Sequence, residues 1–157
     1  MDNVICAVPY DMSVPFFYFH SIEEYEEKYK INFDKYHCEE YEFQFIDGNE
    51  IFTSLWNAIG SYNPLKIFEV YNDIENEHDA LCIEYLMDNC RMSLEDALEQ
   101  YGDVVVHYGT MKELADREFP WHDIDESYHR FIDLDILARD LEHSYCEFKD
   151  DVFIYSI

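Results

Sequence analysis

The sequence predicts an α+β protein made of three small segments. Stretches typical of β-strands occur towards both ends, whereas the middle repeats its apolar residues at helical spacing. Twelve phenylalanines and fourteen tyrosines supply the apolar surface for folded cores, despite a formal net charge of −26. Chains that stay disordered at high net charge are poor in such residues. We therefore expect three folded segments, at residues 1–48, 49–101 and 102–157.

The first segment is predicted to have the order β-β-α-β. Val4–Val8 and Val14–Phe19 are apolar runs of strand length. Ser21 and Glu24 have the spacing of a capping box, which indicates the start of a short helix. Glu40–Phe45 then alternates polar and aromatic side chains, so we expect a strand with its three aromatic residues facing the core.

The middle segment is predicted to be helical. Apolar residues recur at helical spacing in Ile51–Ile59, and further helices are expected around Leu65–Tyr71 and Asp79–Met87. Ser93 is a good N-cap for a last helix, and Gly102 is expected to be its C-terminal residue.

The last segment returns to mixed α+β structure. Val104–Tyr108 is a predicted strand, and Thr110 caps a helix that ends before Pro120. Asp133 is expected to cap the following helix. Two short closing strands are predicted, at Tyr145–Phe148 and Val152–Tyr155.

The negative charge is spread along the whole chain. Residues 1–52, 53–104 and 105–157 hold twelve, eleven and thirteen acids, against three, two and five basic residues. An acidic tail would have placed the excess at one end. The charge instead covers a folded body whose carboxylates repel one another, which destabilises the compact state. A function that uses the charge is therefore expected.

The sign of the charge limits the partners. A net charge of −26 repels phosphate backbones and anionic membranes, so we expect neither direct nucleic-acid binding nor membrane association. The expected partner is a basic protein, and proteins with large basic grooves are commonly those that hold DNA or RNA. Five cysteines without a CxxC pair, and no visible signal peptide, predict reduced thiols in a cytoplasmic protein.

Two acidic stretches could be compared with metal sites. Asp73–Glu84 places acids at calcium-loop spacing, but His78 stands where the loop needs glycine. His122–Asp133 groups histidines and acids without a defined fourth ligand. We expect no metal, no cofactor and no catalytic residue. A metal-dependent or catalytic protein that uses His122–Asp133 stays open as an alternative.

Four stretches of the second and third segments resemble the ArdA antirestriction family. They are Asp79–Leu86, Ser93–Tyr101, Tyr108–Ala115 and Phe131–Leu141. In the last stretch, Ile132-Asp133 and Ala138-Arg139-Asp140-Leu141 match the family pattern. The first segment departs from it, since Ala7–Asp11 stands where the family has an Asn-Leu-Gly-Lys-Tyr-type turn.

The resemblance implies an elongated three-part α+β protein, commonly a homodimer, whose carboxylates imitate the phosphates of bent DNA. Such proteins occupy the DNA groove of type I restriction-modification enzymes and protect a plasmid, transposon or phage that enters a cell. The charge agrees with this function. At one charge per ~1.7 Å of duplex axis, 26 net charges correspond to ~44 Å, or about 13 base pairs.

The expected function is therefore inhibition of a DNA-binding defence enzyme by an acidic DNA mimic. The alternative is an anti-CRISPR inhibitor of a Cas effector, because the nucleic-acid channels of such effectors are also basic. An acidic scaffold or chaperone for basic proteins is a further possibility. The acids expected to imitate phosphates are spread over all three segments: Glu23, Glu24, Glu27, Glu40, Glu42, Asp73, Glu75, Glu77, Glu95, Asp96, Glu99, Glu113, Asp116, Asp133, Asp135 and Asp140.

Overall fold

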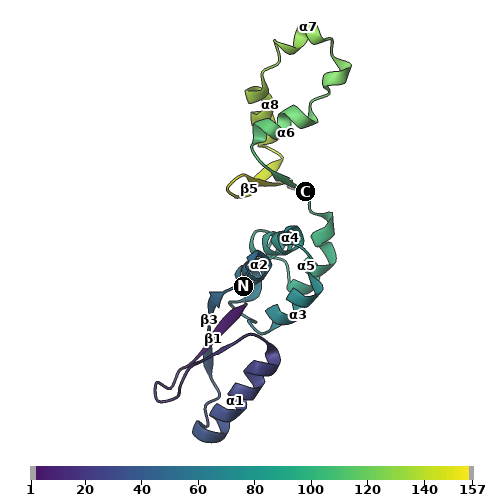
Figure 1. The fold of residues 1–157 in the computed structure, drawn as a ribbon. Coiled ribbons are helices and arrows are strands. Elements are labelled where there is room, and N and C mark those ends of the chain that lie inside the picture. Colours follow the sequence, from purple (N-terminus) through teal and green to yellow (C-terminus); the bar gives the residue numbers. More distant parts are fainter. Residues whose placement is uncertain (1–2, 156–157) are drawn as a thin grey trace. The chain divides into compact units, whose positions relative to one another are not determined.

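The computed structural model describes residues 3–155 and divides the chain into two compact units. Unit 1 is Met1–Gly102 and unit 2 is Asp103–Ile157. Each unit combines helices with an antiparallel three-stranded sheet (Figure 1). The predicted α+β class is confirmed, with a β-β-α-β start, a helical middle and a mixed C-terminal part.

The sheet of unit 1 has the strand order β2-β1-β3. Its strands are β1 (Val4–Pro9), β2 (Phe17–Phe19) and β3 (Tyr41–Asp47), and helix α1 (Ile22–Tyr36) comes between the last two. Ile5 in the central strand lies opposite Phe19 on one side and Phe45 on the other. This register places Phe17 and Phe19 of β2 on the same face of the sheet as Phe43 and Phe45 of β3.

Phe19 lies at the centre of the aromatic core of unit 1. Its side chain is fully buried, and its ring centroid lies 5.1 Å from that of Tyr25, 6.0 Å from Phe43 and 5.8 Å from Phe68. These partners come from α1, from β3 and from the helical middle. The first two predicted segments therefore share one core.

Strand β2 is shorter than the sequence predicts. The stretch Val14–Phe19 was expected to be extended throughout, but only Phe17–Phe19 pairs with β1. Asp11 holds a turn before it, since its carboxylate accepts hydrogen bonds from the amide and the hydroxyl of Ser13. Pro15 has no amide hydrogen to donate to a ladder, which keeps the strand from starting earlier.

Helix α1 begins as predicted and runs further than expected. The Ser21 hydroxyl accepts a hydrogen bond from the Glu24 amide at 3.2 Å. The helix continues for 15 residues and ends where His37 takes a left-handed conformation with φ 57°. The prediction of a short helix was wrong, and the extra turns bring Lys30 and Lys35 onto α1.

Four helices follow in unit 1: α2 (Glu50–Ile59), α3 (Lys66–Asp73), α4 (Glu77–Asp88) and α5 (Leu94–Gln100). Asn49, Asn76 and Ser93 cap three of them, each through its side-chain oxygen. Gly102 does not end α5 as predicted. Tyr101 is the C-cap, and Gly102 lies inside a 3-10 turn, η1 (Tyr101–Asp103).

Unit 2 forms a second sheet with the strand order β4-β6-β5. The predicted capping box is confirmed, because Thr110 and Glu113 bond each other's backbone amides. Leu114 is fully buried in a small core with Met111, Ala115 and Ala138. The elements in chain order are β4 (Val106–Tyr108), α6 (Met111–Glu118), η2 (Trp121–Asp123), α7 (Glu126–His129), α8 (Leu134–Leu141), β5 (Tyr145–Lys149) and β6 (Val152–Tyr155).

Within residues 3–155, no helix has both the length and the hydropathy needed to cross a membrane.

Candidate partner-binding surface

The acidic residues lie almost entirely at the surface. Among residues 3–155, Glu24 and Asp79 are half-buried, Glu84 is buried, and every other acid is exposed. Fifteen of the sixteen acids expected to imitate phosphates are thus available to a partner, and Glu24 is the exception. Exposure is ordinary for carboxylates. The exposed acids differ in their other contacts, which decide how free each one is to bind a partner.

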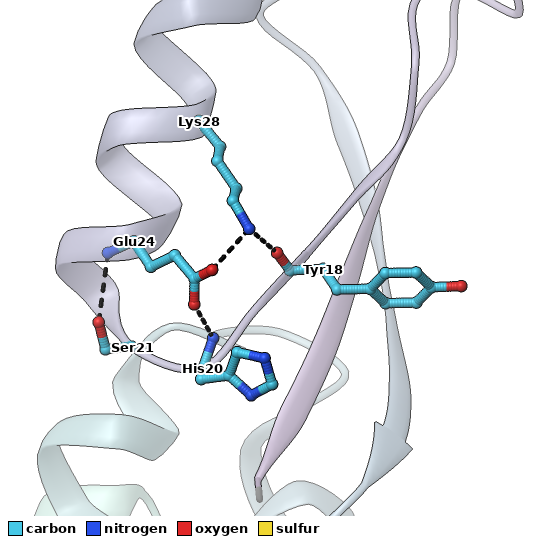
Figure 2. A network of polar contacts seen from close by, with 5 residues as sticks. All are labelled: Tyr18, His20, Ser21, Glu24 and Lys28. Carbon is cyan, nitrogen blue, oxygen red and sulfur yellow. Dashed lines mark hydrogen bonds and ion pairs between the residues drawn. The ribbon is translucent and has the colours of Figure 1, made fainter.

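Glu24 is held in a network at the start of α1 (Figure 2). Its carboxylate accepts hydrogen bonds from Lys28 Nζ at 2.5 Å and from the His20 amide at 2.7 Å. The Lys28 ammonium also donates to the carbonyl of Tyr18 at 2.7 Å. The hydrogen bond from Lys28 is the main reason that the pKa of Glu24 is lowered. Glu24 therefore joins the helix start to β2.

The polar face of α1 is not free of cations. Its exposed acids include Glu23 and Glu27 near the start of the helix, and Lys30 and Lys35 are exposed further along it. Lys28 is already engaged with Glu24. The acids of this helix are therefore interleaved with basic residues. An incoming basic partner would meet like charge there.

The predicted acids of unit 2 mostly have local partners. Glu113 accepts a hydrogen bond from the Thr110 amide at 2.7 Å, and that contact is the main cause of its lowered pKa. Asp116 accepts one from the indole of Trp121 at 3.1 Å. Asp133 caps α8, and Asp135 forms an ion pair with Lys112 at 2.8 Å. These carboxylates therefore stabilise unit 2 itself, in addition to any role at its surface.

The strongest excess of acid lies in the part of unit 1 that follows α1, together with the first residue of unit 2. Residues 39–103, which we name the central acidic segment, contain sixteen acids and two basic residues, Lys66 and Arg91. Lys66 forms an ion pair with Glu69, and Arg91 lies 3.8 Å from Asp88. Two cations cannot neutralise sixteen acids. This segment therefore has the high and uncompensated negative charge that a basic groove would attract.

Two helix N-termini meet within the central acidic segment. The carboxyl groups of Glu50 and Glu77, the first residues of α2 and α4, form a hydrogen bond that raises the pKa of Glu77. Further along the same helices, the Asn57 amide donates to the buried carboxyl of Glu84 at 3.0 Å. The two matched contacts show that α2 and α4 run side by side in the same direction. Their positive dipole ends lie under two exposed acids.

Other acids of the segment gather around Lys66. The charges of Glu69, Glu95 and Asp73 all help to raise its pKa, with the hydrogen bond to Glu69 as the largest cause. Glu95 comes from α5, whereas Asp73 is the last residue of α3. Tertiary folding thus brings together acids that are distant in sequence. Glu40, Glu42, Glu75, Asp96 and Glu99 are further predicted acids exposed on this segment.

The structure gives no support to a metal site in the described part of the chain. Within residues 3–155, no three His, Cys, Asp or Glu side chains are grouped so that they could hold an ion. In the calcium-like stretch, Glu84 turns inward towards Asn57. In the His122–Asp133 stretch, the ring of His129 packs against Trp121, with 4.8 Å between the ring centroids.

Three of the five cysteines lie in the interior. Cys6, Cys38 and Cys82 are buried, and burial raises the pKa of Cys82 to about 11. A thiol with a pKa that high is almost fully protonated at neutral pH and is a weak nucleophile. All five cysteines are free thiols in the structure, as the sequence predicts.

Comparison with known proteins adds no functional assignment. No protein-family model matches the chain, and no curated protein matches it significantly.

Proposed function

We propose that this protein is a non-enzymatic DNA mimic that inhibits a DNA-binding host-defence enzyme, a type I restriction-modification enzyme in the first place. It would act in the cytoplasm of the host cell by occupying the enzyme's DNA groove. The observation that carries the proposal is the central acidic segment, which contains sixteen acids and two basic residues and is folded.

The physical reason is that a DNA-binding groove is built to accept a dense row of fixed negative charges. Binding of such a ligand releases counterions, and the affinity then falls steeply as salt rises. Caps at Asn49, Asn76 and Ser93 fix the helices that carry many of these acids. The carboxylates are therefore held in place before the partner arrives, which lowers the entropy cost of binding.

A homodimer belongs to the same proposal. One chain carries a net charge of −26, and part of that charge must face away from any single groove. A dimer would double the length of anionic surface available to the partner. Light scattering on the purified protein gives its mass in solution, and a monomer at working concentration would remove this part of the proposal.

The test is competition against labelled duplex DNA on a purified type I restriction-modification enzyme and on a purified Cas effector, at two salt concentrations. We expect the protein to displace DNA from the restriction enzyme, and to do so less well at high salt. Displacement from the Cas effector alone would replace the target named here with the anti-CRISPR alternative. If neither enzyme loses its DNA at low salt, the proposal is wrong.

A polyanion control separates mimicry from simple charge. Polyglutamate of matched total charge has the same carboxylates without a fixed layout. We expect it to compete at least about tenfold less well than the folded protein, because it must be ordered on binding. Equal competition would show that the protein acts as an unspecific acidic scaffold for basic proteins.

A further inference from the structure

Unit 1 contains a hollow of about 660 Å³ that is lined mainly by aromatic residues. We name it the aromatic hollow. Its aromatic lining comes from the connection after β1, from β3, from α2 and from the chain after α2: Tyr10, Tyr41, Phe43, Trp56 and Tyr62. Glu42 is the charged residue among the described residues that line it. The hollow thus combines ring surfaces with one acidic residue of β3.

Several of these rings are open to solvent. Tyr10 and Tyr62 are 67% and 59% exposed. Trp56 is half-buried, because its ring packs on Phe45 with 5.7 Å between centroids. Single exposed rings are ordinary on a protein surface, whereas apolar side chains gathered in one place mark an interaction site. Clustered around one hollow, they indicate a binding site.

The position of Trp56 is set by a close backbone approach. A side chain on Gly60, which also lines the hollow, would place its Cβ 2.6 Å from the Trp56 ring. Tyr41 also lines the hollow, but its hydroxyl is buried, and burial is the main reason that its pKa is raised to about 12. It therefore offers no accessible hydroxyl to a ligand.

The electrostatic surroundings select a cation. No basic residue occurs between Lys35 and Lys66, whereas Glu39, Glu40 and Glu42 lie in that interval and are exposed. The faces of aromatic rings attract cations, and tryptophan does so best. Among protein cations, the guanidinium group stacks on rings and donates hydrogen bonds to carboxylates in one plane.

We propose that the aromatic hollow binds an arginine side chain of the basic partner. That the hollow suits arginine is argued from its lining residues. That the arginine comes from a nucleic-acid-binding groove rests on the proposed function. The arginine stacks against the exposed rings and pairs with Glu42. The mimic thereby recognises its partner through one specific pocket as well as through distributed charge.

A second hollow in the same unit adjoins the first, since Asn57, Ser61 and Tyr62 line both. It has a volume of about 490 Å³, and its lining includes both Lys66 and Arg91. These cations repel an incoming guanidinium, although Asp88 and Glu95 also line it. The two hollows are similar in size and differ in charge. Arginine is therefore expected to choose the aromatic hollow.

The first experiment titrates the full-length protein with a blocked tripeptide that has arginine at its centre, and with the same peptide carrying neutral citrulline. The ¹H–¹⁵N signals of the two tryptophan indoles report on binding. We expect a saturable shift of the Trp56 signal with arginine and none with citrulline, while Trp121 in unit 2 does not move. Equal shifts of both indoles, or equal binding of citrulline, would overturn the proposal.

The second experiment uses variants. Tyr10→Ala combined with Tyr62→Ala removes two exposed rings and should weaken arginine binding about tenfold. Tyr18→Ala removes a comparably exposed ring outside the hollow and should change nothing. Circular dichroism confirms that both proteins fold. Unchanged affinity in the double variant would rule out the hollow as the site.

The outcome also separates this inference from the proposed function. If arginine does not bind but the whole protein still competes with DNA, the aromatic hollow is not an arginine site and the DNA-mimic proposal stands. If arginine binds and no DNA-binding enzyme is inhibited, the DNA-mimic proposal is wrong. The aromatic hollow then remains a guanidinium site for a basic partner of another kind.

Discussion

Glu50 and Glu77 begin two parallel helices and hydrogen-bond to each other through their carboxyl groups. Asn57 and Glu84 repeat this pairing two turns further along α2 and α4. An acid pair of this kind is favourable only while one of the two carboxyls holds a proton. The position is tolerated because both groups are exposed and lie over the positive ends of two helices.

Replacing Glu50 with Gln should stabilise the protein at neutral pH. The pair raises the folded-state pKa of Glu77 above its ordinary value of 4.5, so its contribution to stability is present below that value and is lost as the pH rises through the folded pKa. In the Glu50→Gln variant no carboxylate lies beside Glu77, so stability is not lost in this way as the pH rises. Thermal unfolding of the original protein and of the variant is measured at neutral pH and at a pH below the ordinary carboxyl pKa. The variant should be the more stable of the two at neutral pH, and the difference in stability should vanish in acid.

Glu75→Gln is the control for that variant. It removes one exposed acid from the connection between α3 and α4 and therefore reduces the net charge equally. We expect a smaller gain than with Glu50→Gln. Equal gains would mean that general self-repulsion, and not the carboxyl pair, sets the effect.

Neutralising Glu95, Asp96 and Glu99 together should weaken inhibition of the DNA-binding target in a graded way. All three are exposed on α5, which has no basic residue of its own. The dependence of log affinity on log salt should become shallower, by about one for each charge that the groove engages. A single neutralisation should have little effect, and inhibition constants at several salt concentrations measure both.

The matched control neutralises Glu26, Glu27 and Asp34 on α1, where Lys28, Lys30 and Lys35 lie on the same helix. These acids should contribute less to inhibition, because neighbouring cations already offset them. A larger loss from the α1 set than from the α5 set would contradict the importance given to the central acidic segment.

Leu114→Ala should destabilise unit 2 and leave unit 1 folded. Leu114 is fully buried among Met111, Ala115 and Ala138, so its truncation should cost about 2–5 kcal/mol. Each unit contains one tryptophan, Trp56 in unit 1 and Trp121 in unit 2. Variants with a single tryptophan report on each unit by fluorescence during denaturation.

A shift of only the Trp121 transition is expected in that experiment. Loss of both signals at one denaturant concentration would show that the two units unfold as one cooperative body.

Thr110→Ala should cost about 1 kcal/mol, because it removes the hydroxyl that caps α6. Glu113 completes the box, and its pKa is lowered chiefly by the hydrogen bond from the Thr110 amide. Its contribution is therefore present above the ordinary carboxyl pKa and is lost as the pH falls through the folded pKa. Glu113→Gln should remove that pH dependence without changing inhibition greatly. A strong loss of inhibition would show that Glu113 contacts the partner.

Local patterns in the sequence were enough for most elements. Three helix starts are predicted by Ser21, Ser93 and Thr110, because the hydroxyl of each residue accepts a hydrogen bond from a backbone amide in the first turn of the helix. The alternation in Glu40–Phe45 identifies β3 and its buried face in the same local way. The end of α1 was missed because no strong local stop signal marks it. The length of β2 was missed although Pro15, which cannot donate to a ladder, lies inside the stretch that was expected to be extended.

The sequence by itself determined how much negative charge the protein carries and that the charge is spread over folded α+β segments. Only the tertiary structure decided which acids are offset and which are not. It placed Lys112 on Asp135, and Glu50 beside Glu77. It also gathered Tyr10, Trp56 and Tyr62 around one hollow. The reason is physical: charges and rings interact through distance in space, and packing of the core sets those distances between residues far apart in the chain.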